Sequence, residues 1–159
     1  MSSPQSTIEK AEAARACGEL WRAKEILLGS ARTFGFQAEI HRALSRVLIE
    51  MKDTLEAGRH LYASGIPPAS AEEEAAIDVY LKRFGGSSPV QLKSSLPAPL
   101  RSMPFEGWPE SMKEDFLRRG FEPPVKVPQF SGSRDFPLVE TLGFAAIALV
   151  LFVLGVGAV

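Results

Sequence analysis

The sequence is poor in the residues that build covalent crosslinks and metal centres. Among its 159 residues there is one cysteine, Cys17, and there are two histidines, His41 and His60. A single thiol excludes an intramolecular disulfide and a cysteine metal cluster, and it fits a reducing compartment. The two histidines lie on different predicted helices, with no further ligand at metal-binding spacing. We therefore expect no metal site and no cofactor.

An excess of charge of either sign is also absent. The chain has 18 Lys and Arg against 19 Asp and Glu, and no basic face emerges from their order, so nucleic acid is not an expected partner. Motifs for phosphate binding (G-x-G-x-x-G) and for a nucleophilic serine (G-x-S-x-G) are missing, and Cys17 has no neighbouring base. These absences favour a protein that is not an enzyme. The polar first ten residues also lack the apolar run of a secretory signal peptide.

Residues 7–84 show the three- and four-residue spacing of amphipathic helices. The spacing predicts helices over 7–28, with a possible break at Gly18, and over 36–51, 53–64 and 70–84. Asp53 and Ser70 are suited to be N-caps, because each has a glutamate three residues later that completes a capping box. We expect this part of the chain to form one helical domain.

An internal repeat joins two of these helices. Segment 17–27 aligns without gaps with segment 51–61, and the offset between them equals the period of the tetratricopeptide helix pair. Three aligned pairs have matching character: Trp21 with Leu55, Ala23 with Ala57, and Leu27 with Leu61. The small alanines would let neighbouring helices approach closely, and the large residues would fill the groove between helices.

Residues 13–84 resemble tetratricopeptide-type helix pairs. The order typical of one repeat is carried by Ala43, Leu44, Leu48, Asp53, Leu55, Glu56 and Ala57. The same region is also similar to an uncharacterised bacterial domain of unknown function built from such helices. The resemblance implies an all-α fold of antiparallel helix pairs and supplies no activity. The chain departs from the pattern where Lys52 replaces the repeat glycine, and an ordinary four-helix bundle without true repeats remains the alternative.

Residues 85–137 have a different composition, with nine prolines that oppose long helices. We expect a proline-rich linker, interrupted by a short helix over 109–119. Six aromatic residues fall within the linker: Phe105, Trp108, Phe116, Phe121, Phe130 and Phe136. Three interpretations stay open for them. They cover the groove of the helical domain, rest at a membrane interface, or dock a partner.

The segment 138–159 is the strongest signal in the sequence. From Thr141 to the last residue there is no charged side chain, and 19 residues of helix extend about 28 Å, close to the thickness of the hydrocarbon core. We predict a transmembrane helix whose membrane-spanning residues include Leu138, Thr141, Phe144, Ile147, Leu151 and Leu154. The basic residues Lys126 and Arg134 precede it, so we expect a single-pass, tail-anchored protein with a cytoplasmic N-terminal domain.

Together these features predict a membrane-anchored protein-interaction module that recruits or scaffolds a protein partner. The surface residues that we expect to contact the partner are Trp21, Arg22, Arg42, Arg46, Arg59 and Tyr62. The alternative is a small structural or accessory subunit of an integral membrane complex, held there by its C-terminal helix. An enzyme that uses surface Glu, His and Arg is the least favoured hypothesis.

The membrane segment can be tested by deletion. The full-length chain should sediment with membranes and need detergent for extraction, because an uncharged helix of this length is more stable in lipid than in water. The fragment 1–137 should stay in the supernatant of the same lysate. A full-length protein that is freely soluble and monomeric without detergent would contradict the prediction.

Overall fold

The computed structural model describes residues 3–123, and this part of the chain is entirely helical. Its elements, in chain order, are α1 Pro4–Ala16, α2 Leu20–Phe34, α3 Ala38–Glu50, α4 Thr54–Ser64, α5 Ala71–Phe84, α6 Pro89–Ser95, α7 Ala98–Arg101, the 3-10 helix η1 Phe105–Gly107, and α8 Glu110–Arg118. None of these described helices is long and apolar enough to cross a bilayer. The predicted span over 138–159 lies outside the described residues.

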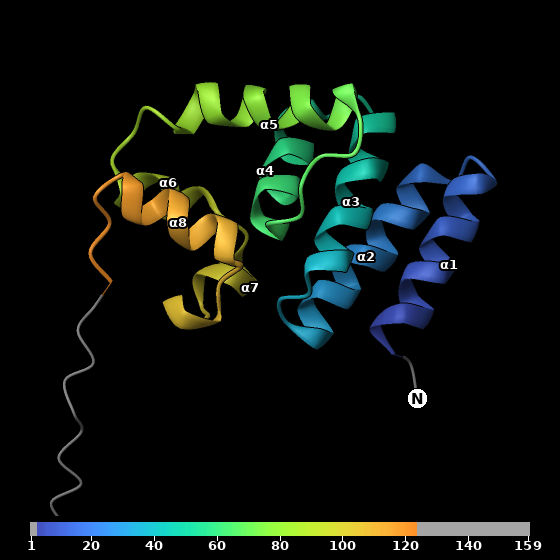
Figure 1. The fold of residues 1–159 in the computed structure, drawn as a ribbon. Coiled ribbons are helices and arrows are strands. Elements are labelled where there is room, and N and C mark those ends of the chain that lie inside the picture. The colour runs from blue at the N-terminus through green and yellow to red at the C-terminus, as the bar shows by residue number, and fades with distance from the viewer. Residues whose placement is uncertain (1–2, 124–159) are drawn as a thin grey trace, which may run out of the picture. The chain divides into compact units, whose positions relative to one another are not determined.

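The first four helices form two pairs with the same spacing of helix starts along the chain. Helices α1 and α3 each contain 13 residues. Their starts at Pro4 and Ala38 are as far apart in the sequence as the starts of α2 at Leu20 and α4 at Thr54. This interval is the offset of the sequence repeat, which therefore coincides with a recurring structural unit. Figure 1 shows α1, α2 and α3 side by side, with α5 crossing over α4.

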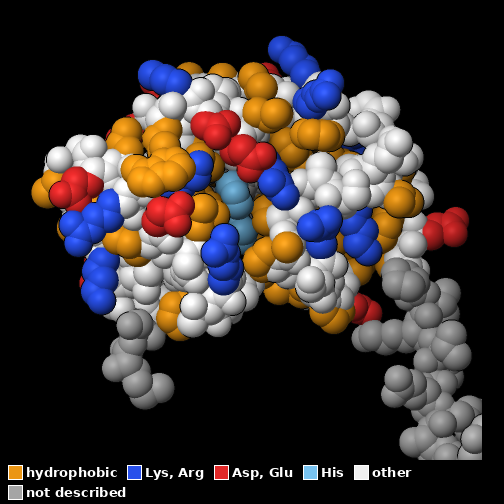
Figure 2. Space-filling model, turned by 180° about the vertical axis from the view of Figure 1, so that it is seen from behind, with side chains coloured by type: hydrophobic (Ala, Val, Ile, Leu, Met, Phe, Trp, Pro, Cys, Tyr) orange, Lys and Arg blue, Asp and Glu red, His pale blue; other side chains and the backbone are white. Residues whose placement is uncertain are grey.

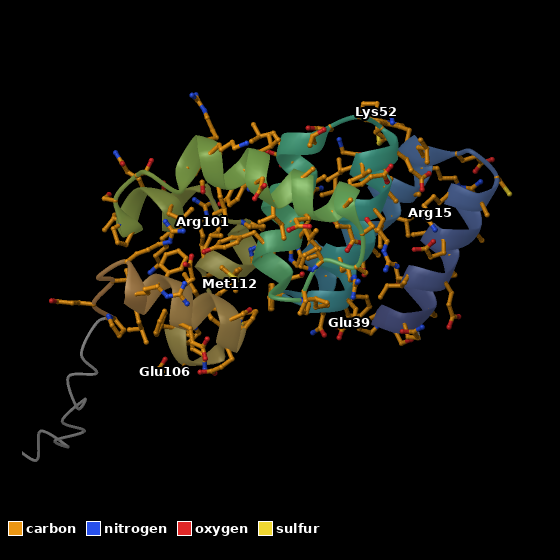
Figure 3. The ribbon with its side chains drawn as sticks, turned by 45° about the horizontal axis from the view of Figure 1, so that its top comes forward. Arg15, Glu39, Lys52, Arg101, Glu106 and Met112 are labelled. Atoms are coloured by element: carbon orange, nitrogen blue, oxygen red, sulfur yellow. The ribbon has the colours of Figure 1, made fainter. Side chains whose placement is uncertain are left out.

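The turns inside the two pairs match in detail. Three successive N–H groups return to carbonyls of the preceding helix in each turn, those of Cys17, Gly18 and Glu19 and those of Met51, Lys52 and Asp53. Gly18 has a φ of 77° and Lys52 a φ of 64°. Lys52 is the only non-glycine residue with positive φ among the described residues, and its side chain lies at the edge of the helices (Figure 3). The missing repeat glycine is thus replaced by a lysine in the same left-handed conformation, at a cost of about 1 kcal/mol.

Side-chain caps begin four of the described helices, α1, α4, α5 and α6. The Asp53 and Ser70 side chains accept hydrogen bonds from the N–H groups of Glu56 and Glu73, at the predicted positions. Helix α1 differs from the expectation, because it begins at Pro4 rather than near residue 7. There the Ser3 side chain forms a capping box with Ser6, and Pro4 occupies the first helical turn, where its missing N–H costs nothing.

Two hydrophobic cores lie within residues 3–123. The first is built from α1 to α4 together with Ala76 of α5, and both repeat alanines, Ala23 and Ala57, are completely buried in it. The second joins α4 and α5 to the helices that follow them, and its fully or almost fully buried members are Ala63, Tyr80, Leu92, Leu96, Leu100, Trp108, Met112 and Phe116. Helices α4 and α5 therefore contribute to both cores.

The structure differs from the predicted linker over residues 89–118. Three α-helices and η1 occupy this stretch, and α8 lies where the short helix over 109–119 is predicted. The prolines are the reason. Pro89 occupies the first turn of α6, while Pro97, Pro104 and Pro109 each directly precede a helix, so they delimit short helices rather than prevent them.

The aromatic residues of this stretch that the structure describes pack in the second core. Trp108 and Phe116 are buried, and their rings meet edge to face with centroids 5.1 Å apart. Phe105 and Phe121 pack against the same core. Met112 of α8, labelled in Figure 3, is buried beside them. Phe130 and Phe136 lie outside the described residues.

Helices α4 and α5 cross at a glycine. A Cβ atom added to Gly58 would overlap the carbonyl oxygen of Ala76 in α5, so only glycine permits this approach of the two backbones. Gly29, in the middle of α2, provides the opposite case, because a Cβ there would meet no atom within 4 Å. A side chain at position 58 would therefore clash with α5, whereas a side chain at position 29 would not clash.

This contrast gives a matched pair of stability predictions. Gly58→Ala should lower the free energy of unfolding by about 2–3 kcal/mol, because α5 must shift away from α4. Gly29→Ala should raise it by about 0.5–1 kcal/mol, because alanine is the better helix former at an uncrowded position. Urea unfolding followed by circular dichroism measures both. Equal effects of the two substitutions would show that the α4–α5 crossing is not a tight contact.

Candidate functional site

The six residues predicted to contact a partner lie on three helices and in three different environments. Trp21 and Arg22 begin α2, Arg42 and Arg46 lie on α3, and Arg59 and Tyr62 lie on α4. The structure does not bring all six onto one surface. Arg42, Arg46 and Tyr62 are occupied by contacts inside the domain, as the following geometry shows.

Arg42 and Arg46 are held by a buried carboxylate. Glu73 of α5 accepts a hydrogen bond from Nε of Arg46 at 3.2 Å, and Nη2 of Arg42 lies 3.5 Å from its other oxygen. The Ala69 N–H donates to the same carboxylate at 2.7 Å. Burial raises the pKa of Glu73, but these hydrogen bonds and the two positive charges outweigh it and leave the pKa below its ordinary value. This group joins α3 to α5.

Tyr62 is also used internally. Its hydroxyl donates a hydrogen bond of 2.7 Å to Oδ2 of Asp115 in α8, and Nε of Arg119 donates to the same oxygen at 2.8 Å. Arg119 continues to the carbonyl of Gly85 at the end of α5. Burial, together with the hydrogen bond to Asp115, raises the pKa of Tyr62 well above its ordinary value. Tyr62 therefore fastens α8 to α4 and keeps its proton.

Trp21, in contrast, is exposed at the surface. It keeps 63% of its surface accessible, and the Nζ atom of Lys24 lies 5.0 Å from the centre of its ring. Lys24 forms no ion pair within residues 3–123. Arg22, next in the chain, is paired with Glu19 at 2.9 Å. Leu55, at the position equivalent to Trp21 in the second helix pair, is exposed as well.

Arg59 lies between an open cavity and a buried pair of histidines. Its Nη1 binds the carboxylate of Glu56 at 3.0 Å, and its Nη2 donates to the carbonyl of Leu96 at 3.2 Å. On one side it borders an open cavity of about 610 Å³ between α4, α5 and α6. The residues that line this cavity are mainly polar: Leu55, Glu56, Arg59, Tyr80, Arg83, Phe84, Ser87, Gln91, Ser94 and Ser95. On its other side lies a pair of histidines.

His41 of α3 and His60 of α4 face each other in the interior. Their Nδ1 atoms are 2.8 Å apart, and His41 and His60 keep only 1% and 8% of their surfaces exposed. The two rings are nearly parallel with centroids 5.1 Å apart, and the Nδ1–Nδ1 contact places them end to end rather than face to face. The ring of Phe36 is also nearly parallel to that of His41, with centroids 5.2 Å apart. Since one Nδ1 must donate and the other accept, the two imidazoles are held in different tautomers.

The surroundings indicate which imidazole donates. Nε2 of His41 is buried without a partner, and an unpaired lone pair is tolerated better there than an unpaired N–H. His41 thus carries its proton on Nδ1 and donates it to His60, which in turn carries its own proton on Nε2. The Nε2 atom of His60 forms no hydrogen bond within the described residues and is not fully enclosed.

Both histidines are neutral near pH 7. Burial, with a smaller contribution from the charge of Arg59, lowers the pKa of His41 to about 4. Burial also lowers the pKa of His60 well below its ordinary value, helped by His41, Arg59 and Lys24. Lys24 and Arg59 both disfavour the charged form of the His60 imidazole.

We use the name α2–α4 strip for Trp21 and Lys24 of α2 together with Arg59 and His60 of α4. Figure 2 shows histidine at the floor of a hollow, with hydrophobic, basic and acidic side chains around its rim. Within residues 3–123 no group of three or more His, Cys, Asp and Glu is placed to hold a metal ion. The chemistry that the strip offers is hydrogen-bond donation and positive charge beside an exposed indole.

Comparison with known proteins provides no relative. No protein-family model, curated protein or solved structure matches this chain. The assignment of a function therefore depends on the geometry of the chain itself.

The histidine pair is a feature that we did not predict from the sequence. A signal was nevertheless present, because His41 precedes the buried Leu44 and Leu48 by three and seven residues, and His60 follows the buried Ala57 by three. These intervals place both histidines on the inward faces of their helices. The pattern does not show that His41 and His60 lie opposite each other where α3 packs against α4.

The histidine pair predicts a loss of stability in mild acid. In the unfolded chain both imidazoles protonate near pH 6.5, whereas the folded state resists protonation until about pH 4 at His41. The unfolded state therefore binds more protons between these values, and stability falls as the pH falls. His41 alone should contribute a loss of about 3 kcal/mol over this window.

Urea unfolding of the full-length chain in detergent, at intervals from pH 7.5 to 4.5, measures this dependence. His60→Asn keeps a hydrogen-bonding atom near the Nδ1 position but cannot titrate, so its stability should depend less steeply on pH. Glu73 does not interfere, because its lowered pKa means that its contribution is lost only below this range. A wild-type stability that is constant from pH 7 to 5 would refute the buried neutral pair.

Proposed function

We propose that this protein is a membrane-anchored protein-interaction module. The helix over 138–159 holds it at the cytoplasmic face of the membrane, and the α2–α4 strip recruits or scaffolds a protein partner there. In this proposal the two helix pairs act as a short tetratricopeptide-like array. The recurrence of both helices and of their turn, at the offset of the sequence repeat, supports that part of the proposal.

The observation that carries the proposal is the exposure of Trp21. An indole with 63% of its surface in water leaves apolar area whose burial would be worth about 3 kcal/mol. Tryptophan is also among the residues that dominate binding energy at protein interfaces. The second core shows that this chain can bury a tryptophan, since Trp108 is only 3% exposed.

The repeat supports the same surface. Leu55 occupies the position of Trp21 in the second pair and is exposed too, although Ala57 and Leu61 nearby are completely buried. Helical arrays present equivalent positions of successive repeats on one side, where a partner can contact several of them. The cavity beside Leu55 and Arg59 extends this side with polar groups and the exposed Arg83.

Site-specific crosslinking in cells tests the function. A photoreactive phenylalanine analogue at position 21 of the full-length chain should give a discrete adduct with another protein. The matched control is position 117, because Leu117 of α8 is 51% exposed but lies outside the strip. The analogue at that position should give no adduct of the same mass.

The partner identified by that adduct can then be purified and its affinity measured. Trp21→Ala should weaken binding by about 2 kcal/mol or more, close to 30-fold, and Leu117→Ala should have no effect. Identical adducts from positions 21 and 117, or none from position 21, would contradict an interface at the strip.

A further inference from the structure

The cavity between α4, α5 and α6 has a floor whose polar groups are already paired. The hydroxyl of Tyr80 lies 2.5 Å from Oγ of Ser95, and Ser95 donates its own proton to the carbonyl of Leu92 at 2.7 Å. Tyr80 is therefore the donor in the first of these hydrogen bonds. Burial raises the pKa of Tyr80, so it keeps that proton. The floor joins α5 to α6 and offers a ligand neither a charge nor an unused donor.

The rest of the lining, in contrast, has unused hydrogen-bond donors. Arg83, near the end of α5, is exposed, and its guanidinium forms no hydrogen bond or ion pair within the described residues. The hydroxyl of Ser87 is also without a partner there. Gln91 of α6 accepts the N–H of Ser88 with its Oε1 atom at 3.3 Å, which leaves its amide N–H groups unused. Three lining residues can therefore donate to a ligand.

The charge of the lining has the same bias. Among the described residues that line the cavity, Glu56 is the one acid, and Nη1 of Arg59 binds it at 3.0 Å, so this pair is neutral. Arg83 adds a positive charge that no acid of this lining balances. Arg101 of α7, labelled in Figure 3, donates to the carbonyl of Ser94 in the lining at 3.1 Å and forms no ion pair within the described residues. A ligand that accepts hydrogen bonds and carries negative charge therefore complements the cavity.

We propose that the cavity between α4, α5 and α6 binds a small organic oxyanion, a carboxylate or a phosphate monoester, that also carries an apolar group. Arg83 binds the oxyanion through its planar guanidinium, which matches both kinds of group, and Ser87 and Gln91 donate further hydrogen bonds. Leu55 and Phe84 provide the apolar contact. The cavity's volume of about 610 Å³ is in the range of small-molecule sites. A ligand site of this kind goes beyond the recruitment of a protein partner and does not depend on it.

Nuclear magnetic resonance can observe this cavity directly, because the chain contains four glutamines and no asparagine. Its side-chain amide signals are therefore few, and Gln91→Met identifies the signal of Gln91 by removing it. The ¹⁵N-labelled full-length protein, held in detergent micelles, is titrated with phenyl phosphate, with benzoate and, as a neutral control, with benzyl alcohol.

The two anions should shift the Gln91 signal saturably, whereas benzyl alcohol should leave it in place. The anion that binds more tightly shows whether the cavity prefers a phosphate monoester or a carboxylate. The signals of Gln5 and Gln37, which do not line the cavity, should not move. A Gln91 signal that neither anion shifts, or that benzyl alcohol shifts as much, would overturn the proposal.

Two neighbouring variants on α5 separate the site from general effects of charge. Arg83→Met and Lys82→Met each remove one positive charge from an exposed position, but only Arg83 lines the cavity. Arg83→Met should weaken binding of both anions about tenfold or more, because charged hydrogen bonds are lost, and Lys82→Met should leave the affinity unchanged. Equal effects of the two substitutions would refute the site. Crosslinking at position 21 tests the proposed function separately, since Trp21 does not line the cavity.

Discussion

The arrangement of the described residues depends on the close approach of α4 and α5 at Gly58. Because no side chain separates the two backbones there, α5 lies directly on α4 and both helices can serve two cores. Ala57, on the same helix, belongs to the first core and Ala63 to the second. Helix α4 therefore couples the helix pairs to the proline-delimited helices, and it also carries Arg59 and His60, the residues that define the candidate site.

The distribution of charge follows from this packing. Where α3 meets α5, Glu73 neutralises Arg42 and Arg46. Hydrogen bonds and the charges of the two arginines lower the pKa of Glu73 and keep it ionised. On α2, Lys24 forms no ion pair within the described residues, and Trp21 remains exposed to water beside it. A buried ion pair joins elements of the fold, whereas an unbalanced cation next to an exposed indole favours association with another molecule. The two surfaces thus differ in whether their basic side chains are paired within the described residues.

Much of the local structure is predictable because local signals determine it. The all-helical fold expected from the sequence is confirmed for residues 3–123. Asp53 and Ser70 cap their helices, since the hydrogen bonds involved span only three residues. The predicted linker differs because proline composition alone does not distinguish an extended chain from short helices that each begin after a proline. The spacing of Leu92, Leu96 and Leu100, all buried in the second core, carried that information.

The sequence by itself determined the helices within residues 7–84, the caps Asp53 and Ser70, the recurrence of the helix pair and the uncharged segment from Thr141 onward, because each depends on local composition and spacing. Only the tertiary structure decided which charged groups are free and which are engaged. Arg46 and Glu73 are 27 residues apart, and His41 and His60 are 19 residues apart. Their contacts depend on how helices cross, and that crossing is set by steric fits such as that of Gly58 against Ala76. Contacts between residues that are so far apart along the chain produce no periodic pattern in a single sequence.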